Sequence, residues 1–467
     1  MVNGTRNRRS IDMTQGPELK RIVLFALPIM FGQLLQQLYS TVDGIVVGNY
    51  VSSAALAAVG NCMTMSFLFI AVSNGMANGS GIVISQAFGA GRERDMRDAA
   101  ASVLLVMVVL GAALTLFGTL GAEFCVKRLL AVRDPGLQAQ AAAYLRVYSL
   151  GLIFTFLYNA AAAILRAVGD SRAVLYFLLV STVVNVVLDL LFVAVFRWGV
   201  VGAAWATVIS QLACVIVSFL YMLRNYPVFR FRSLRELRPP RRMLALCLRM
   251  GAPSTLQQLI ISSGHVFSQR LVNSFGEAAI AAVTVGTRFD HYCSIPSLSL
   301  FQAMASFTGQ NVGAGRYDRV TRGVWRTAGL NCAVVAVLCL GMYLFAAPLS
   351  GLFGVEGETL RLSVDYLHVL AMSMPIFALY LPFNGTFQGA GAPLTCALIS
   401  LSALATRVIA SYVLVYAFHF GPEACWVTYW FGWVIALVYA MIVFLRGKWK
   451  TKRVVGGAAP AETEAAG

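Results

Sequence analysis

AVLYFLLVSTVVNVVLDLLFVAVF, residues 173–196, is an apolar run long enough to cross a bilayer as one helix. It contains Asn185 and Asp189, which are four residues apart and therefore share one face of that helix. A carboxylate in hydrocarbon costs a few kcal/mol at least, so an intramembrane acid indicates a functional site unless it only holds packed helices together. This stretch predicts the membrane class of the chain and the position of a candidate site.

The composition of the whole chain is typical of a membrane protein. Of its 467 residues, 58% are hydrophobic and 12% are charged, whereas about 25% are charged in an average soluble protein. The net charge of +16 comes from Lys and Arg in short loops between apolar runs, which indicates topology and not nucleic-acid binding. The nine Cys contain no CxxC pair and are typical of small buried hydrophobes. We expect a lipid bilayer, and no nucleic acid, as the partner.

Twelve apolar runs predict twelve transmembrane helices. They span residues 22–48, 54–86, 99–120, 138–163, 173–196, 201–222, 243–271, 278–309, 326–347, 360–384, 394–418 and 424–446. The connections after the even-numbered helices are rich in Arg and Lys, and the alternate connections are poor in them. The positive-inside rule then predicts a multi-pass protein of the cell (inner) membrane with both termini in the cytoplasm.

The two halves of the chain repeat motifs in the same order. QAFGAGR at 86–92 recurs as QNVGAGR at 310–316, and AALAAV at 54–59 recurs as AAIAAV at 278–283. Repeats of six helices enter the membrane with the same orientation, so an axis along the membrane normal relates them and a substrate path lies between them. The predicted fold is all-α and integral to the membrane, with twelve transmembrane helices in two pseudo-symmetric six-helix lobes.

The repeat also predicts the domain boundaries. They are a cytoplasmic N-terminal tail at 1–20, an N-lobe at 21–222, a basic cytoplasmic linker at 223–242, a C-lobe at 243–446 and a disordered cytoplasmic tail at 447–467. The tail is predicted to be disordered because its end is rich in Gly, Ala, Pro and Glu.

Polar residues within the N-lobe helices converge at one depth. At 1.5 Å per residue, Asp43, Asp189 and Thr207 lie about 8, 12 and 10 Å below the outer ends of their helices. Two carboxylates with the Asn185 amide and the Thr207 hydroxyl suit a Na⁺, or a proton shared between the acids. We therefore predict a cation-binding site at Asp43, Asn185, Asp189 and Thr207, with Na⁺ or H⁺ as the coupling ion and no further cofactor.

The repeat supplies the equivalent positions in the C-lobe. Asp43 corresponds to Ser268, Asn185 to Arg407, Asp189 to Ser411 and Thr207 to Thr428. The second half has lost both acids and gained a cation. Acids that only held helices together would be expected in both halves, so the asymmetry favours one cation site, in the N-lobe alone.

A second set of polar residues is predicted to line the path between the lobes. Its members are Gln36, Gln37, Gln258, Arg288, Asp290 and Arg407. The glutamines fit interhelical hydrogen bonds equally well. Arg288 and Asp290 fit equally well a pair with each other or with Arg407.

These features together resemble the multidrug and toxic compound extrusion (MATE) transporters. The matching features are Leu27-Pro28, Asp43, the two Gly-Ala-Gly-Arg loops, Leu165 to Asp170, and Asn185-x3-Asp189, and the resemblance runs from about Leu19 to Arg446. It implies two six-helix lobes in a V shape and efflux of organic compounds driven by Na⁺ or H⁺ antiport. It also implies a cation site at Asp43, Asn185, Asp189 and Thr207, in agreement with the depth argument.

The chain departs from the family pattern on the seventh and tenth helices. Some members use acids there, whereas this chain offers Gln257, Gln258, His265 and Asn384. This difference favours coupling through the N-lobe. The set of Arg residues in the C-lobe keeps anionic or zwitterionic cargo among the candidates.

We therefore expect a monomeric, cation-coupled exporter of small organic compounds that works by alternating access. It is not expected to be an enzyme, because the chain carries no HExxH, GxSxG or Walker A motif. A flippase for lipid-linked precursors, which shares the broad helical plan, is the alternative. The count of twelve helices and the Asn-x3-Asp motif oppose it.

Overall fold

The computed structural model describes the chain as helices joined by short loops. It covers residues 10–51, 53–130, 132, 134–231, 236 and 238–455, with backbone alone at residues 39–50, 53–58, 61 and 265–266. Within these ranges the regular structure is helical and contains no strand. The all-α class predicted from the sequence is confirmed.

The helices follow one another in two long series. The first is α1 (Glu18–Tyr50), α2 (Ser53–Gly89), α3 (Glu93–Leu120), α4 (Ala122–Phe124), the π-helix η1 (Cys125–Leu129), α5 (Pro135–Leu150), α6 (Leu152–Ala167), α7 (Ser171–Asp189), the π-helix η2 (Leu190–Val195), α8 (Gly199–Asn225) and the 3-10 helix η3 (Pro227–Phe229). The second is α9 (Arg241–Asn273), α10 (Glu277–Gly313), α11 (Tyr317–Leu344), α12 (Ala346–Gly351), α13 (Gly357–Ala390), α14 (Pro393–Tyr416), α15 (Ala424–Leu445) and the 3-10 helix η4 (Lys448–Thr451).

Each of the twelve predicted helices is matched by a long helical segment. Over the described residues, nine helical segments are long and apolar enough to cross a membrane, and the bent pair α5–α6 makes a tenth. The remaining two, α9 and α10, have 33 and 37 residues but carry more polar side chains along their length. Ten of the twelve predicted spans are therefore confirmed as long and apolar enough, and the other two are matched in length.

The fourth predicted helix, 138–163, is broken at Gly151. There α5 and α6 meet at an angle of 43°. The Gly151 N–H donates to Tyr148 O, three residues back, so the regular i→i−4 pattern is interrupted. A Cβ at Gly151 would lie 3.0 Å from Val208, so the absent side chain lets the bend approach α8.

Two helices begin before their apolar runs. The predictions started at residues 99 and 326, whereas α3 starts at Glu93 and α11 at Tyr317. The additional first turns contain charged residues and precede the apolar run of each helix. Acidic residues in these turns favour a helix start because they face the positive end of the helix dipole.

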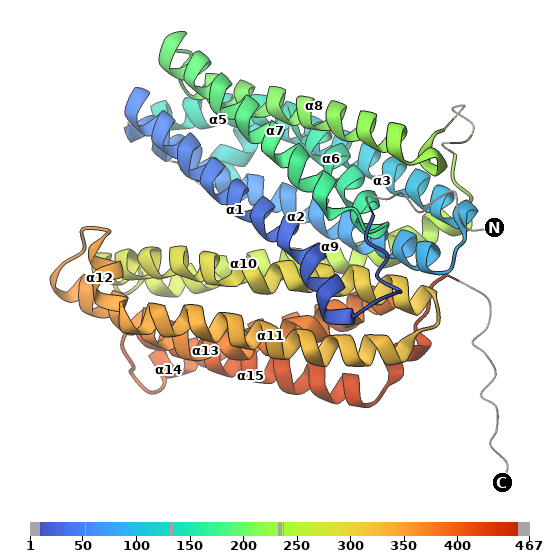
Figure 1. Cartoon of the computed structure of the whole chain (residues 1–467). Helices are drawn as coiled ribbons and strands as arrows, with labels where there is room; N and C mark the ends of the chain where they lie inside the picture. The colour runs from blue at the N-terminus through green and yellow to red at the C-terminus, as the bar shows by residue number, and fades with distance from the viewer. Residues whose placement is uncertain are drawn as a thin grey trace.

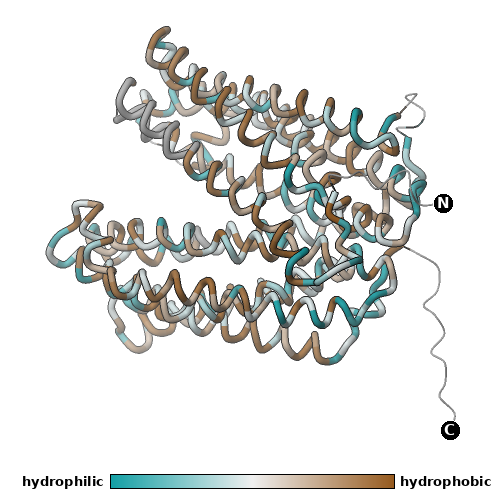
Figure 2. The backbone as a smooth tube through the Cα atoms, viewed as in Figure 1, coloured by the Kyte–Doolittle hydropathy of each residue, from teal (hydrophilic) through white to brown (hydrophobic). Residues whose placement is uncertain are grey.

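The helices form two lobes that diverge from one end of the molecule, in the V shape that the resemblance implied (Figure 1). The N-lobe contains α2–α8 and the C-lobe contains α10–α15. The first and last described residues, 10 and 455, lie at the end where the lobes meet, which we call the terminal end; the opposite end is the far end. Hydrophobic residues run along the helices and hydrophilic residues gather at the terminal end (Figure 2).

The first helix, α1, crosses from one lobe to the other. At the terminal end its Ile22 and Phe25 lie in the apolar core of the C-lobe. Beyond Pro28, α1 packs along α7, where the Cβ position of Gly32 lies 2.9 Å from Leu178. A single helix therefore belongs to the C-lobe at one end and to the N-lobe at the other.

The helix α9 makes the reverse crossing. Its Cys247 and Met250 lie in the apolar core of the N-lobe. Beyond Pro253, α9 packs along α14 of the C-lobe. Cys247 and Met250 are the repeat equivalents of Ile22 and Phe25, so the two crossings obey the repeat symmetry. The predicted lobe boundaries stay a prediction, because this packing crosses both of them.

The tail at 447–467 was predicted to be disordered, and for residues 447–455 this is wrong. Residues 448–451 form η4, in which Trp449 is buried and stacks on Phe444 with ring centroids 5.5 Å apart. The prediction was based on the Gly, Ala, Pro and Glu at the end of the tail. It did not consider Trp449, which precedes them and packs against the C-lobe. Residues 456–467 lie outside the described residues.

Small residues bring α2 and α9 into close contact. A Cβ at Gly79 would lie 2.4 Å from Met250 O and 2.8 Å from Gly251 Cα. A Cβ at Gly75 would lie 2.4 Å from Thr255 Cα. Small residues allow such approach of helix backbones, which packing and hydrogen bonds stabilise in a membrane.

The Gly79→Ala substitution should lower the stability of the protein. Its added methyl group meets main-chain atoms that yield only if a helix moves, and overpacking of this kind costs about 1–3 kcal/mol. Thermal unfolding of the purified protein in detergent measures the loss. Gly329→Ala on α11 is the control, because its Cβ would meet nothing within 4 Å; equal losses in both variants would contradict the prediction.

Candidate functional site

Asn185 and Asp189 lie on the buried face of α7. Their relative exposures are 1% and 0%, and α7 packs against both α1 and α8. Over the described residues, the Asn185 amide makes no hydrogen bond. A buried amide and a buried carboxylate one turn apart form a polar face that is closed to lipid.

The chain changes helix type directly after Asp189. The α-helix ends there and η2 begins at Leu190 as a π-helix, in which Phe196 N–H donates to Leu191 O at 2.9 Å. Single π turns within α-helices are rare and occur often at functional sites, because the extra residue per turn re-aims neighbouring groups. Residues 190–195 are all apolar, so the sequence pattern did not predict this turn.

Thr207 lies on the neighbouring helix, α8, with 9% relative exposure. Its hydroxyl donates to Ala203 O at 3.1 Å. One turn further along α8, Ser181 of α7 donates to Ser210 O at 3.3 Å. This hydrogen bond between helices shows that the polar faces of α7 and α8 meet.

The side chain of Asp43, the fourth residue of the predicted site, lies outside the described residues. Its helix, α1, packs against α7 and η2. The described part of the site therefore consists of Asn185, Asp189 and Thr207 on adjoining helices, and the assignment of all four residues to one cation site stays a prediction.

The structure joins the four repeat equivalents in the C-lobe. Arg407 donates from Nη2 to Ser268 Oγ at 3.0 Å. Ser411 Oγ lies 2.6 Å from Thr428 Oγ1 and donates to Arg407 O at 2.9 Å. The register of the repeat thus selects four positions that touch one another, which supports the same grouping in the N-lobe.

A guanidinium occupies the place in the C-lobe that corresponds to the predicted cation site. Arg407 stacks over Tyr429, with its Cζ 4.5 Å from the ring centroid. It also interacts electrostatically with Asp290. Tyr366 completes the cluster through its hydroxyl, 3.3 Å from that of Tyr429. The positive charge of the C-lobe cluster is therefore part of the protein itself, in the guanidinium of Arg407.

The other residues predicted to line the path lie in different surroundings. Gln36 is exposed, and Gln37 and Gln258 are half-buried. Arg288 is exposed and lies over Phe353, with its Cζ 5.8 Å from the ring centroid. Asp290 accepts a hydrogen bond from Ser294 Oγ at 3.2 Å and lies within electrostatic range of Arg407, whereas Arg288 lies over an aromatic ring.

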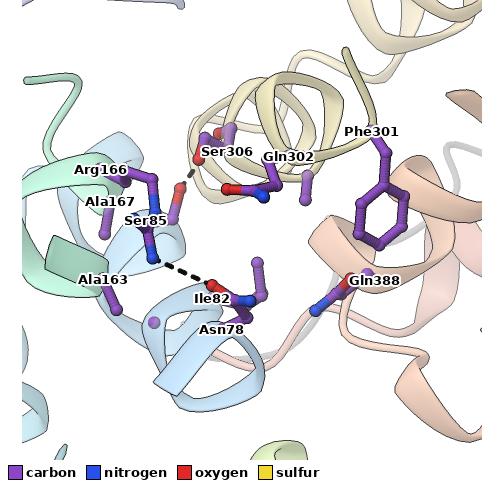
Figure 3. A pocket seen from close by; sticks show the side chains of 12 residues that line it. Asn78, Ile82, Ser85, Ala163, Arg166, Ala167, Phe301, Gln302, Ser306 and Gln388 are labelled. Carbon is purple, nitrogen blue, oxygen red and sulfur yellow. Dashed lines mark hydrogen bonds between the residues drawn. The ribbon is translucent and has the colours of Figure 1, made fainter. Parts of the chain in front are cut away.

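A small polar pocket between the lobes escaped the sequence analysis. It has a volume of about 30 Å³ and lies between α2, α6, α10 and α13. Arg166 donates across it to Asn78 Oδ1 at 3.1 Å, and Gln302 and Gln388 face it from the other lobe (Figure 3). Asn78 and Gln302 are repeat equivalents, as are Arg166 and Gln388, so the repeat register was the available signal.

The fold defines an integral membrane protein of two six-helix lobes, with a buried amide and a buried carboxylate on α7. The MatE family model matches residues 28–191 and 253–413. The chain belongs to this family of multidrug and toxic compound extrusion transporters.

Relatives match along nearly the whole chain. The probable multidrug resistance protein YoeA of Bacillus subtilis is 29% identical over 444 residues, which is 92% of this chain and 94% of YoeA. The probable multidrug resistance protein YpnP of the same bacterium is 28% identical over 458 residues, or 96% of this chain and 99% of YpnP.

Solved structures share the fold. A crystal structure of a MATE protein in the bent conformation has a TM-score of 0.86 at 24% identity and covers 95% of this chain and 97% of its own. A MOP superfamily transporter from Pyrococcus furiosus, whose binding pocket is described as of reverse polarity, has a TM-score of 0.87 at 23% identity. It covers 96% of this chain and 99% of its own.

The Arg407→Met substitution should destabilise the C-lobe. It removes the hydrogen bond to Ser268, the contact with Tyr429 and the charge near Asp290, which together are worth about 1–3 kcal/mol. Arg288→Met is the matched control, because Arg288 is exposed and its loss should change stability by about 0.5 kcal/mol or less. Thermal unfolding of both variants checks this, and equal effects would contradict it.

Proposed function

We propose that the protein exports organic compounds in exchange for Na⁺ or H⁺, and that Asp43, Asn185, Asp189 and Thr207 bind the coupling cation. The contrast between the two repeat-related clusters carries this proposal. The N-lobe cluster presents a buried carboxylate, an amide and a hydroxyl on α7 and α8. The C-lobe cluster holds Arg407 in the equivalent place. A carboxylate such as Asp189 is a cation ligand, whereas the equivalent position in the C-lobe holds the hydroxyl of Ser411.

The terminal end is proposed to face the cytoplasm. The Lys and Arg of the loops gather on the connections at this end, in agreement with the positive-inside rule. Hydrogen bonds between the lobes, among them Gln86 to Gly389 O at 3.0 Å and Ser85 to Ser306 O at 3.1 Å, lie on its side of the molecule. The arrangement is then that of a transporter closed to the cytoplasm.

The crossing of α1 gives the cation a way to act on both lobes. Asp43 lies in the part of α1 that runs along the N-lobe, while Ile22 and Phe25 lie in the C-lobe core. Pro28 lies between them and removes one helical hydrogen bond, so α1 bends there at a low cost. Binding of the cation repacks the outer part of α1 against α7, and the inner part carries the change to the C-lobe. The coupling equals the difference in cation affinity between the two states.

The cargo is proposed to be a small organic compound held between the lobes. The names of YoeA and YpnP as probable multidrug resistance proteins support this class. Arg288 and Arg407 give the C-lobe side of the path positive charge, with Asp290 as the neighbouring acid. Anionic or zwitterionic compounds therefore belong among the cargo to be tested. The flippase alternative finds no support in the names of these relatives.

The Asp189→Asn and Asp43→Asn substitutions should each abolish gradient-driven export. Either change removes a carboxylate ligand and leaves a neutral amide of the same shape, so transport should fall at least about tenfold, as expected where a bond to a charged group worth roughly 1.5–3 kcal/mol is lost. Export of a fluorescent dye from vesicles with an imposed Na⁺ or pH gradient measures this and identifies the ion.

Asp365→Asn is the control for both variants. Asp365 lies on α13 and pairs with Arg361 at 3.4 Å, with both side chains exposed, so its charge should not affect coupling. Wild-type rates in the Asp189→Asn or Asp43→Asn variant would exclude the proposed cation site.

A further inference from the structure

Two glutamines at the terminal end make equivalent contacts across the lobes. Gln86 of α2 donates from Nε2 to Gly389 O of the C-lobe at 3.0 Å. Gln310 of α10 donates from Nε2 to Ala167 O of the N-lobe at 3.0 Å. Gln86 and Gln310 are repeat equivalents, and so are Ala167 and Gly389. One glutamine of each lobe therefore donates a hydrogen bond to a main-chain carbonyl of the other lobe, at equivalent positions.

Both amides are fully buried and also accept hydrogen bonds from the chain ends. Gln86 Oε1 accepts from Val454 N at 2.8 Å and from Val455 N at 3.3 Å. Gln310 Oε1 accepts from Met13 N at 3.0 Å. Each glutamine thus joins its own helix, the opposite lobe and one terminal segment.

The N-terminal segment, residues 10–17, spans both lobes. Ile11 N donates to Gly169 O of the N-lobe at 2.9 Å. On the C-lobe side, Asn311 Nδ2 donates to Met13 O at 3.1 Å and Arg319 Nη2 donates to Gly16 O at 2.8 Å. The segment therefore resists separation of the lobes independently of the glutamines.

The C-terminal segment, residues 447–455, also spans both lobes, but it runs from the C-lobe to the N-lobe. Trp449 is buried in the C-lobe core, and Arg453 Nη2 donates to Gly313 O at 2.7 Å. A few residues later, Val455 is buried in the N-lobe core. Each segment therefore fixes one of the two glutamines: the C-terminal segment bonds Gln86 and the N-terminal segment bonds Gln310.

We propose that Gln86 and Gln310 are the gate of the transport path at the terminal end and that the two terminal segments hold this gate closed. The inference rests on the proposed function, because a transporter that alternates between two sides must open this end. Opening must separate Gln86 from Gly389 and Gln310 from Ala167. An amide that loses its partner while buried pays a desolvation penalty, so the two bonds open together with the displacement of the segments.

The Gln86→Glu and Gln310→Glu substitutions test the gate. A glutamate keeps the acceptor for the terminal segment but loses the donor to the opposite lobe, and its charged oxygen then faces a carbonyl oxygen. We expect amide hydrogen exchange at the terminal ends of α2 and α10 to become faster by on the order of tenfold in each variant. Because the contacts are equivalent, the two variants should behave alike. Hydrogen–deuterium exchange mass spectrometry of the full chain in lipid nanodiscs measures this.

The control is the same chemical change at the far end. Gln138 Nε2 donates to Val132 O at 2.6 Å within the N-lobe, so Gln138→Glu should leave exchange at the terminal end unchanged. No acceleration in either gate variant, or an equal acceleration in Gln138→Glu, would overturn the proposal. The measurement uses neither gradient nor cargo, so its failure is distinct from failure of cation coupling.

A truncation after Arg453 tests the role of the segments and leaves both glutamines in place. It removes the Val454 and Val455 N–H groups that donate to Gln86. Exchange should become faster at the end of α2, and less so at the end of α10, whose Gln310 keeps its bond from Met13. Exchange equal to that of the full chain would overturn the closing role of the C-terminal segment, and it stays measurable where a glutamate variant does not fold.

Discussion

The main chains of α2 and α10 touch at two glycines that the repeat makes equivalent, and the arrangement of the lobes depends on this contact. A Cβ at Gly89 would lie 1.8 Å from Gln310 O, and a Cβ at Gly313 would lie 2.0 Å from Gln86 O. Neither distance leaves room for a side chain, so any other residue would push the lobes apart at the terminal end. The Gly of each Gly-Ala-Gly-Arg motif that ends its helix is therefore needed for lobe packing, whereas the tight turn falls on the next glycine, Gly91 or Gly315, at φ 68° or 73°.

Duplication of a six-helix unit would by itself give two equal polar clusters. In this protein the two clusters differ in charge. In the C-lobe, Arg407 supplies a permanent cation within reach of Ser268, Tyr429 and Asp290. A guanidinium is charged at every accessible pH, so this cluster has one charge state and one set of contacts. The N-lobe face of Asn185 and Asp189 has no such resident cation among its described contacts. On the proposed mechanism, ion binding then changes one lobe and leaves the other as a fixed reference.

Much of this architecture was predictable because hydrophobic length and loop charge are strong signals in a membrane protein. Twelve spans, two repeated lobes and the equivalence of Asn185 with Arg407 followed from runs and register alone. The break at Gly151, the π-helix after Asp189 and the docking of Trp449 did not, because each depends on a neighbour distant in sequence. The register aligned the Gln86 and Gln310 motifs, but only the fold shows that each glutamine reaches the opposite lobe. For the candidate site, depth along the helices predicted that Asp189 and Thr207 lie at a similar level, but only the fold shows that α7 and α8 adjoin. The partners of Arg288 and Arg407 likewise required side-chain positions.

The two crossing helices explain how unequal clusters act on an otherwise symmetric frame. Both α1 and α9 enter the core of the opposite lobe at the terminal end, and both contain a proline near the end of that contact, at Pro28 and Pro253. Beyond the proline the two helices differ. The outer part of α9 is tied to the C-lobe, since Gln257 donates to Ser400 at 2.9 Å and Ser268 accepts from Arg407. The outer part of α1 carries Asp43 beside α7, where its interactions change with the proposed cation. On the proposed mechanism, equal hinges with unequal anchors make α1 the helix that moves and α9 the helix about which the lobes turn.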